Sequence, residues 1–202
     1  MELLHFYETP DDGYFKLFKT ECKISYTQIL NDISNYVYDC DGFSINSRNT
    51  GLFTTNKHKV GKPLCSDWKY IPIRYIYQTF TPILYTLLDI VQGLYQERTF
   101  TDAIVNVYND GDFIAHHKDF HELDHQPCSV VFSFEEHENE EHIMEFYRTI
   151  GDKWSTKKDR SDKGEAFTIS LPHQSIGIMV GMQRNYVHAI RPGKKRISIV
   201  FR

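Results

Sequence analysis

The stretch VNVYNDGDFIAHHKD, residues 105–119, decides the fold expected for this chain. Its first half alternates apolar and polar residues and predicts a β-strand, Asp110-Gly111 predicts a tight turn, and a second extended run follows. That run ends in His117-x-Asp119. Because alternate residues on an extended chain point to the same side, the two side chains can reach one ion together.

A second histidine is expected to complete this site. An imidazole and a carboxylate on one face suit a borderline metal such as Fe(II), which then requires another imidazole from elsewhere in the chain. His188 in NYVHAI is the natural candidate, inside the last strand-rich stretch. His116 also precedes Asp119, but in a strand it points to the face opposite His117. Taken singly, each histidine also fits an ordinary core or surface position.

The C-terminal run RISIVFR adds two fixed positive charges. Arg196 and Arg202 are six residues apart, so both guanidinium groups lie on one face of the final strand. Two such groups suit a dicarboxylate or a phosphate, although the same spacing also occurs on a solvated strand face.

The rest of the chain predicts a mostly β fold with flanking helices. Apolar residues recur at helical spacing over 24–37 and over 82–96, where Pro82 opens the run. From residue 103 onward the pattern changes to short β-rich runs, which predict an antiparallel barrel or jelly roll backed by the two helices. These runs are 103–108, 129–134, 142–147, 166–171, 175–180, 184–188 and 196–202.

Length and composition predict one domain spanning 1–202. The chain has 202 residues, of which 41% are hydrophobic and 25% charged, which excludes a disordered chain. It contains no apolar run of membrane-spanning length, and the acidic N-terminus lacks the features of a signal peptide. We therefore expect an intracellular, soluble monomer, in the cytoplasm or nucleus, with no membrane partner. Four cysteines lack C-x2-C spacing and are expected to be reduced and buried: Cys22, Cys40, Cys65 and Cys128.

Charge is distributed unevenly along the chain. The formal net charge of −4 argues against binding to nucleic acid through bulk charge. Residues 135–145 carry six glutamates, of which those in 135–141 predict a solvated hairpin tip. Residues 166–202 contain no acid and six cations, so an anionic ligand should face the C-terminal strands.

The order of these motifs resembles the AlkB family of Fe(II)- and 2-oxoglutarate-dependent dioxygenases. That family reads N-x-Y-x2-G-x5-H-x-D, then a histidine preceded at two residues by tyrosine, then R-x5-R. The matching residues are Asn106, Tyr108, Gly111, His117, Asp119, Tyr186, His188, Arg196 and Arg202. The resemblance implies a double-stranded β-helix, with a catalytic jelly-roll core over about 103–202 and a nucleotide-recognition lid over about 44–77, a stretch that otherwise predicts long irregular loops.

The resemblance also implies roles for these residues. His117, Asp119 and His188 would bind Fe(II). Arg196 would pair with the distal carboxylate of 2-oxoglutarate, helped by the Tyr108 hydroxyl. Asn106 and Arg202 would lie near the proximal end of this cosubstrate, and O2 is the second cosubstrate. The carboxylate at Asp119 argues against halogenation, because halogenating relatives carry a small residue there.

Three residues are expected to contact a flipped-out base. The resemblance places Trp68 and Tyr70 at the family's aromatic pair, with Tyr70 stacking on the base. Packing of the lid alone explains both aromatics equally well. Glu122 could reach the base edge, although family members usually carry this acid one or two residues after the aspartate ligand. Arg48 and Phe53 match a scaffold strand of the family.

The expected activity is oxidative demethylation of bases such as 1-methyladenine and 3-methylcytosine in single-stranded or locally opened DNA or RNA. A second hypothesis keeps the iron chemistry and changes the substrate to a protein, a lipid or another non-repair substrate. A third is a binding protein whose iron site is silent.

Overall fold

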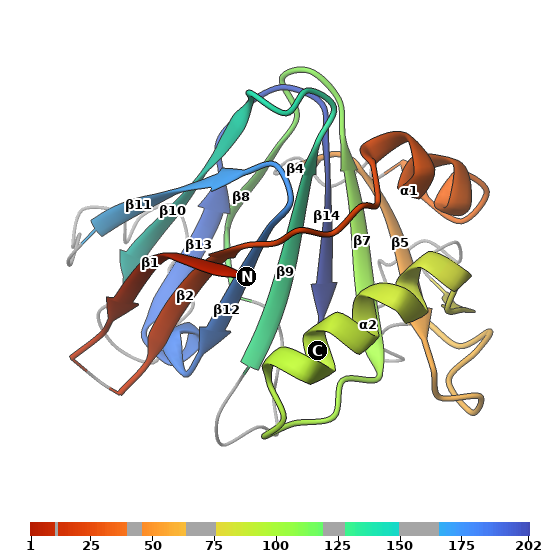
Figure 1. The fold of residues 1–202 in the computed structure, drawn as a ribbon, viewed down its shortest axis with the longest axis horizontal. Coiled ribbons are helices and arrows are strands. Elements are labelled where there is room, and N and C mark those ends of the chain that lie inside the picture. Colours follow the sequence, from red (N-terminus) through yellow and green to blue (C-terminus); the bar gives the residue numbers. More distant parts are fainter. Residues whose placement is uncertain (11, 40–45, 64–75, 119–127, 150–165) are drawn as a thin grey trace.

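Two β-sheets of unequal size face each other, and two helices cover the outer face of the larger one (Figure 1). The computed structural model describes residues 1–10, 12–39, 46–63, 76–118, 128–149 and 166–202. The predicted jelly roll with two helices from the first half of the chain is confirmed.

The large sheet runs in the order β1-β2-β12-β9-β14-β7-β5-β3, and β6 pairs with β5. Its neighbours are antiparallel except β5 and β6, which are parallel. The strands are β1 (Glu2–Glu8), β2 (Tyr14–Lys19), β3 (Tyr38–Asp39), β5 (Asn49–Thr54), β6 (Tyr77–Thr79), β7 (Asp102–Tyr108), β9 (Cys128–Glu135), β12 (Ser175–Val180) and β14 (Arg196–Phe201).

The small sheet runs in the antiparallel order β11-β10-β13-β8-β4. Its strands are β4 (Asn46–Ser47), β8 (Phe113–His117), β10 (Glu141–Arg148), β11 (Ala166–Pro172) and β13 (Tyr186–Ile190), and a short 3-10 helix, η2 (Met182–Arg184), precedes β13.

Each helix begins at a residue that caps it. In α1 (Tyr26–Ile33) Ser25 and Gln28 form a reciprocal capping box, and in α2 (Pro82–Leu94) the Thr81 side chain accepts from the backbone of Leu84. The expected helix over 24–37 is too long, because α1 ends at Ile33 and residues 34–36 form a turn. The Ser-Asn-Tyr-Val sequence that follows has weak helix propensity.

The apolar side chains form two main clusters, one on each face of the large sheet. The outer cluster joins α1 and α2 to the residues of β7, β9, β12 and β14 that point toward the helices. The inner cluster fills the space between the sheets, with Phe15 and Met179 from the large sheet and Met144 and Phe146 from the small one. Side chains on the inner face of β7 and β14 therefore point between the sheets.

The hairpin of β1 and β2, at one edge of the large sheet, was not expected. β5 lies within the stretch 44–77, so the expectation of irregular loops does not hold for residues 49–54, where the family resemblance had instead placed a scaffold strand with Arg48 and Phe53. This short segment contains Asn and Gly, and its strand conformation depends on pairing with β7 along its full length. Residues 64–75 of the expected lid lie outside the described residues.

Of the cysteines expected to be buried, Cys128 is buried and Cys22 is only partly buried. Cys40 and Cys65 lie outside the described residues. In the described ranges, no helix is long and apolar enough to cross a membrane.

Gly177 in β12 lets an aromatic ring lie directly on the sheet. A Cβ at this position would lie 2.6 Å from Cζ of Phe15. We expect Gly177→Ala to lower the free energy of unfolding by about 1–3 kcal/mol, because the fully buried ring must move. Urea denaturation measures this change.

Gly93→Ala in α2 is the matched control. A Cβ at Gly93 meets nothing within 4 Å, so this variant should be stabilised by about 0.5–1 kcal/mol through higher helix propensity. Equal unfolding midpoints for the two variants would contradict the close packing at Gly177.

Candidate functional site

Two histidines from neighbouring strands of the small sheet lie side by side. His117 at the end of β8 is directly opposite His188 on β13, and their ring centroids are 4.2 Å apart. His188 is buried and His117 is partly buried. Nδ1 of His117 lies 2.8 Å from the carbonyl oxygen of Ala115. Since a carbonyl only accepts, Nδ1 carries the proton and Nε2 keeps a lone pair for a metal.

His116 points to the other face of the same strand. Its Nε2 lies 3.7 Å from Oε2 of Glu145, and its ring meets Tyr147 edge to face at 4.6 Å. The structure therefore brings His117, and not His116, together with His188.

The remaining protein ligand must come from outside this pair. Within the described ranges, no group of three His, Cys, Asp or Glu side chains could hold a metal ion. Asp119, the expected carboxylate ligand, lies outside the described residues, as do Trp68, Tyr70 and Glu122.

Arg196 and Tyr108 form a buried cation–π pair on the large sheet. They are directly opposite on β14 and β7, each about 1% exposed, and the guanidinium carbon lies 4.6 Å from the centre of the tyrosine ring. Among the described residues, neither Nε nor Nη1 of Arg196 has a hydrogen-bond partner. A buried guanidinium is costly without an acceptor, so these atoms fit an incoming carboxylate.

Asn106 connects this pair to the neighbouring strand. It lies two residues before Tyr108 on the same face, and its Oδ1 accepts from Nε of Arg48 at 2.8 Å and from Oγ1 of Thr50 at 3.0 Å. Its Nδ2 donates to Oγ of Ser198 at 3.4 Å.

The polar row around Asn106 includes residues that the sequence analysis missed. Thr50, Asn106, Ser198 and Ser133 are register partners across four adjacent strands. The spacing of Ser198, two residues after Arg196 on the same strand face, is the signal that could have identified it.

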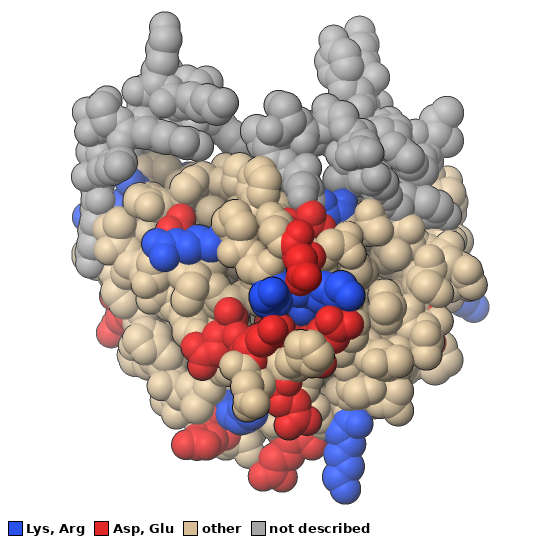
Figure 2. All heavy atoms as spheres, turned by 90° about the horizontal axis from the view of Figure 1, so that it is seen from above, with Lys and Arg blue, Asp and Glu red and all other residues tan. Residues whose placement is uncertain are grey.

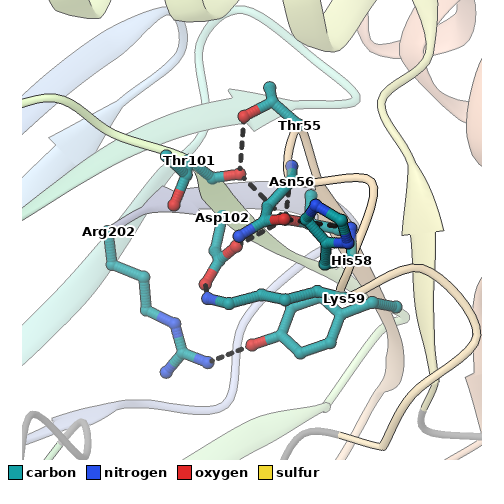
Figure 3. Close-up of polar contacts among 9 residues, drawn as sticks. Thr55, Asn56, His58, Lys59, Thr101, Asp102 and Arg202 are labelled. Carbon is teal, nitrogen blue, oxygen red and sulfur yellow. Dashed lines mark hydrogen bonds and ion pairs between the residues drawn. The ribbon is translucent and has the colours of Figure 1, made fainter.

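Arg202 directly follows β14, at the end opposite Arg196. Figure 3 shows Arg202 beside Asp102. Its Nη2 donates to the hydroxyl of Tyr77 at 3.4 Å, and its backbone pairs with that of Asp102. The Asp102 carboxylate accepts from Lys59 at 2.6 Å and from Thr54 at 2.7 Å. Arg202 therefore lies on the same strand face as Arg196. Their Cα atoms are about 20 Å apart at the usual rise per residue, so the long side chains must extend along the strand for both guanidinium groups to approach one ligand.

The acidic residues gather at the end of the molecule formed by the tight turns. The turn 109–112 and the tip 136–140 are tied to residues 193–195 by the bonds Gly111 N to Gly193 O at 2.7 Å and Glu136 N to Lys195 O at 3.1 Å. Figure 2, seen from above Figure 1, shows acidic side chains around a smaller basic cluster. His117 lies at the other end of β8 from this turn, so the carboxylates at the tip are remote from the histidine pair.

The expected solvated tip over 135–141 is exposed at residues 136–139 and 141, while Glu140 is partly buried. Glu136, Glu138 and Glu141 are exposed, but Glu135 is fully buried as the last residue of β9. Its carboxylate contacts His142, which explains why burial is possible.

The model of the 2OG-Fe(II) oxygenase superfamily matches residues 47–202, which include every site residue described above. The chain belongs to this superfamily, and it is a dioxygenase that uses Fe(II), 2-oxoglutarate and O2. The histidine pair fits the metal, and Nε and Nη1 of Arg196, which have no hydrogen-bond partner in the described part of the chain, fit a carboxylate of 2-oxoglutarate.

Solved structures agree with this fold. The structure of OsALKBH1 is similar with a TM-score of 0.60 at 13% sequence identity, covering 98% of this chain and 99% of that one. A prolyl-4-hydroxylase from Pseudomonas putida is similar with a TM-score of 0.54 at 12% identity, covering 93% of this chain and 91% of that one. No curated protein sequence matches this chain.

Proposed function

We propose that the protein removes methyl groups from ring nitrogens of bases in DNA or RNA, such as 1-methyladenine and 3-methylcytosine. The observation that carries this proposal is the fold: it aligns nearly end to end with OsALKBH1, with the AlkB-like motifs on its facing strands. In the reaction, 2-oxoglutarate and O2 oxidise the N-methyl carbon. Succinate, CO2 and formaldehyde leave, the ring nitrogen keeps the electron pair of the broken C–N bond, and the hydroxyl proton of the hemiaminal is released.

His117, His188 and Asp119 would hold the iron, which when bound supplies the oxidation of the methyl C–H bond. The proton on Nδ1 of His117, held by the Ala115 carbonyl, directs Nε2 toward the metal. Burial of His188 keeps its imidazole oriented and limits access of water to the metal.

Arg196 would bind the distal carboxylate of 2-oxoglutarate. Its stacking on Tyr108 fixes the plane of the guanidinium, and the tyrosine hydroxyl can donate a further hydrogen bond. Asn106 and Arg202 would face the proximal end, with Asn106 fixed by its contacts to Thr50 and Arg48.

Trp68, Tyr70 and Glu122 would hold the extruded base, the aromatic side chains by stacking and the glutamate at the base edge. Lysines near the lid, such as Lys57 and Lys62, are exposed and can contact phosphates. The acidic tip at 136–140 is too far from the histidine pair to repel phosphates there, because it lies at the opposite end of β8 from His117.

Hydroxylation of a protein side chain is the alternative that a specific observation favours. The Pseudomonas putida prolyl-4-hydroxylase shares the fold over most of both chains. The same site would then leave the oxygen on the product, and no formaldehyde would form.

Mass spectrometry of oligonucleotides tests the proposal. DNA and RNA strands carrying 1-methyladenine or 3-methylcytosine are incubated with the protein, Fe(II), 2-oxoglutarate and air. We expect the mass of one methylene to be lost, and to be retained with the His117→Ala variant. Succinate formation with every oligonucleotide intact would contradict the proposed substrate and favour the alternative.

A further inference from the structure

A buried acid and a buried histidine contact each other between the two sheets, outside the residues assigned above. Oε2 of Glu135 at the end of β9 lies 2.6 Å from Nδ1 of His142 on β10, and both side chains are fully buried. Oγ of Ser133 donates to Oε1 of Glu135 at 2.9 Å. In the described ranges, neither ring nitrogen of His142 nor Oε2 of Glu135 makes a hydrogen bond, so the 2.6 Å approach is a close polar contact, and Glu135 is the polar group nearest to this imidazole.

Glu135 is also the direct neighbour of Arg196. The two residues are register partners on the antiparallel strands β9 and β14, and Tyr108 is opposite Arg196 on the other side. Directly opposed residues have Cβ atoms about 4.5–5.5 Å apart on the same face of the sheet. A glutamate and an arginine at this separation can form a bidentate ion pair.

This ion pair does not form. The guanidinium lies over Tyr108, the carboxylate lies against His142 and Ser133, and Nε and Nη1 of Arg196 have no acceptor among the described residues. The Glu135 carboxylate therefore contacts His142 and Ser133, although Arg196 is its direct neighbour on the next strand.

We propose that His142 is a positioning residue for cosubstrate binding: it holds the Glu135 carboxylate away from Arg196, so that the guanidinium stays available for the distal carboxylate of 2-oxoglutarate. This inference rests on the proposed role of Arg196. Without His142, the carboxylate of Glu135 keeps only the Ser133 hydroxyl on Oε1, and its free oxygen turns to the nearest cation. It then competes with 2-oxoglutarate inside the protein.

The test measures 2-oxoglutarate binding rather than turnover. Equilibrium dialysis of radiolabelled 2-oxoglutarate against the Mn(II)-loaded protein, without oxygen, gives the dissociation constant. We expect His142→Leu to raise it at least tenfold, and the double variant His142→Leu/Glu135→Gln to restore it to within threefold of wild type. Glu135→Gln alone should bind as tightly as wild type or more tightly, since the competing charge is gone.

Two controls separate this role from a general effect on packing. His173→Leu removes another buried imidazole beside Glu135, one that contacts the backbone nitrogen at 3.0 Å and not the carboxylate, and should leave the dissociation constant unchanged. A 2-oxo acid without a distal carboxylate, such as 2-oxovalerate, should compete for the metal equally well in wild type and in His142→Leu.

The outcomes are distinguishable. If wild type does not bind 2-oxoglutarate, the proposed role of the site itself fails. If wild type binds and His142→Leu binds equally, or if the double variant is not restored, the positioning role is overturned. If His142→Leu does not fold, weaker binding by Glu135→Gln alone would overturn it, since Glu135 would then assist Arg196 rather than compete with the cosubstrate.

Discussion

Replacing His117 by alanine is expected to weaken binding of Mn(II) or Fe(II) at least about 100-fold, more than the loss of a supporting residue typically costs. Turnover should be lost with the metal. The physical reason is that His117 and His188 lie together between β8 and β13, and removal of either imidazole leaves one histidine in the described part of the site.

His116→Ala is the matched control for this prediction. This neighbouring histidine points to Glu145 and Tyr147 on the opposite face of the strand, so its loss should change metal affinity by no more than about twofold. Electron paramagnetic resonance of free Mn(II) during a titration measures both variants. Equal losses for His116 and His117 would show that the assignment of the ligand is wrong.

Replacing Arg196 by methionine is expected to weaken binding of 2-oxoglutarate without lowering the free energy of unfolding. A carboxylate left without its buried cation costs about 2–5 kcal/mol, so the Michaelis constant for 2-oxoglutarate should rise from about 30-fold to several thousand-fold. The free energy of unfolding should stay the same or increase. The guanidinium is buried with two nitrogens that lack acceptors, and an apolar side chain of similar length removes that cost.

Urea denaturation without 2-oxoglutarate and steady-state kinetics with it measure the two effects. His173→Leu, which alters a buried side chain near the same sheet end, should instead lose stability and keep the Michaelis constant. A large loss of stability in Arg196→Met with an unchanged Michaelis constant would mean that Arg196 is a structural residue.

Residues with a strict period or a fixed spacing were predictable from the sequence. The run 105–119 predicted β7, the turn and the extended segment that became β8, and the alternation within it correctly placed His116 and His117 on opposite faces. The even spacing of Arg196 and Arg202 predicted that both lie on the same face of the last strand. The prediction was possible because β14 pairs with β7 without a bulge, so its side chains alternate regularly.

Elements that depend on distant partners were not predictable from local periodicity. β5 contains Asn49 and Gly51 and becomes a strand through its pairing with β7, so the local pattern indicated loops and only the family resemblance placed a strand there. Glu135 was expected in a solvated tip, since nothing local to it indicates that His142 from the next strand lies against its carboxylate. Burial of an acid depends on its partner in space, which the sequence pattern alone does not give.

The most direct test of the account counts products in one reaction. Purified protein with Fe(II), 2-oxoglutarate and an oligonucleotide containing 1-methyladenine or 3-methylcytosine is quenched at early times, and succinate, formaldehyde and restored base are quantified. Demethylation predicts that all three form in equal amounts. Succinate without formaldehyde, with the methyl carbon still on the base, would contradict demethylation and favour hydroxylation of another substrate.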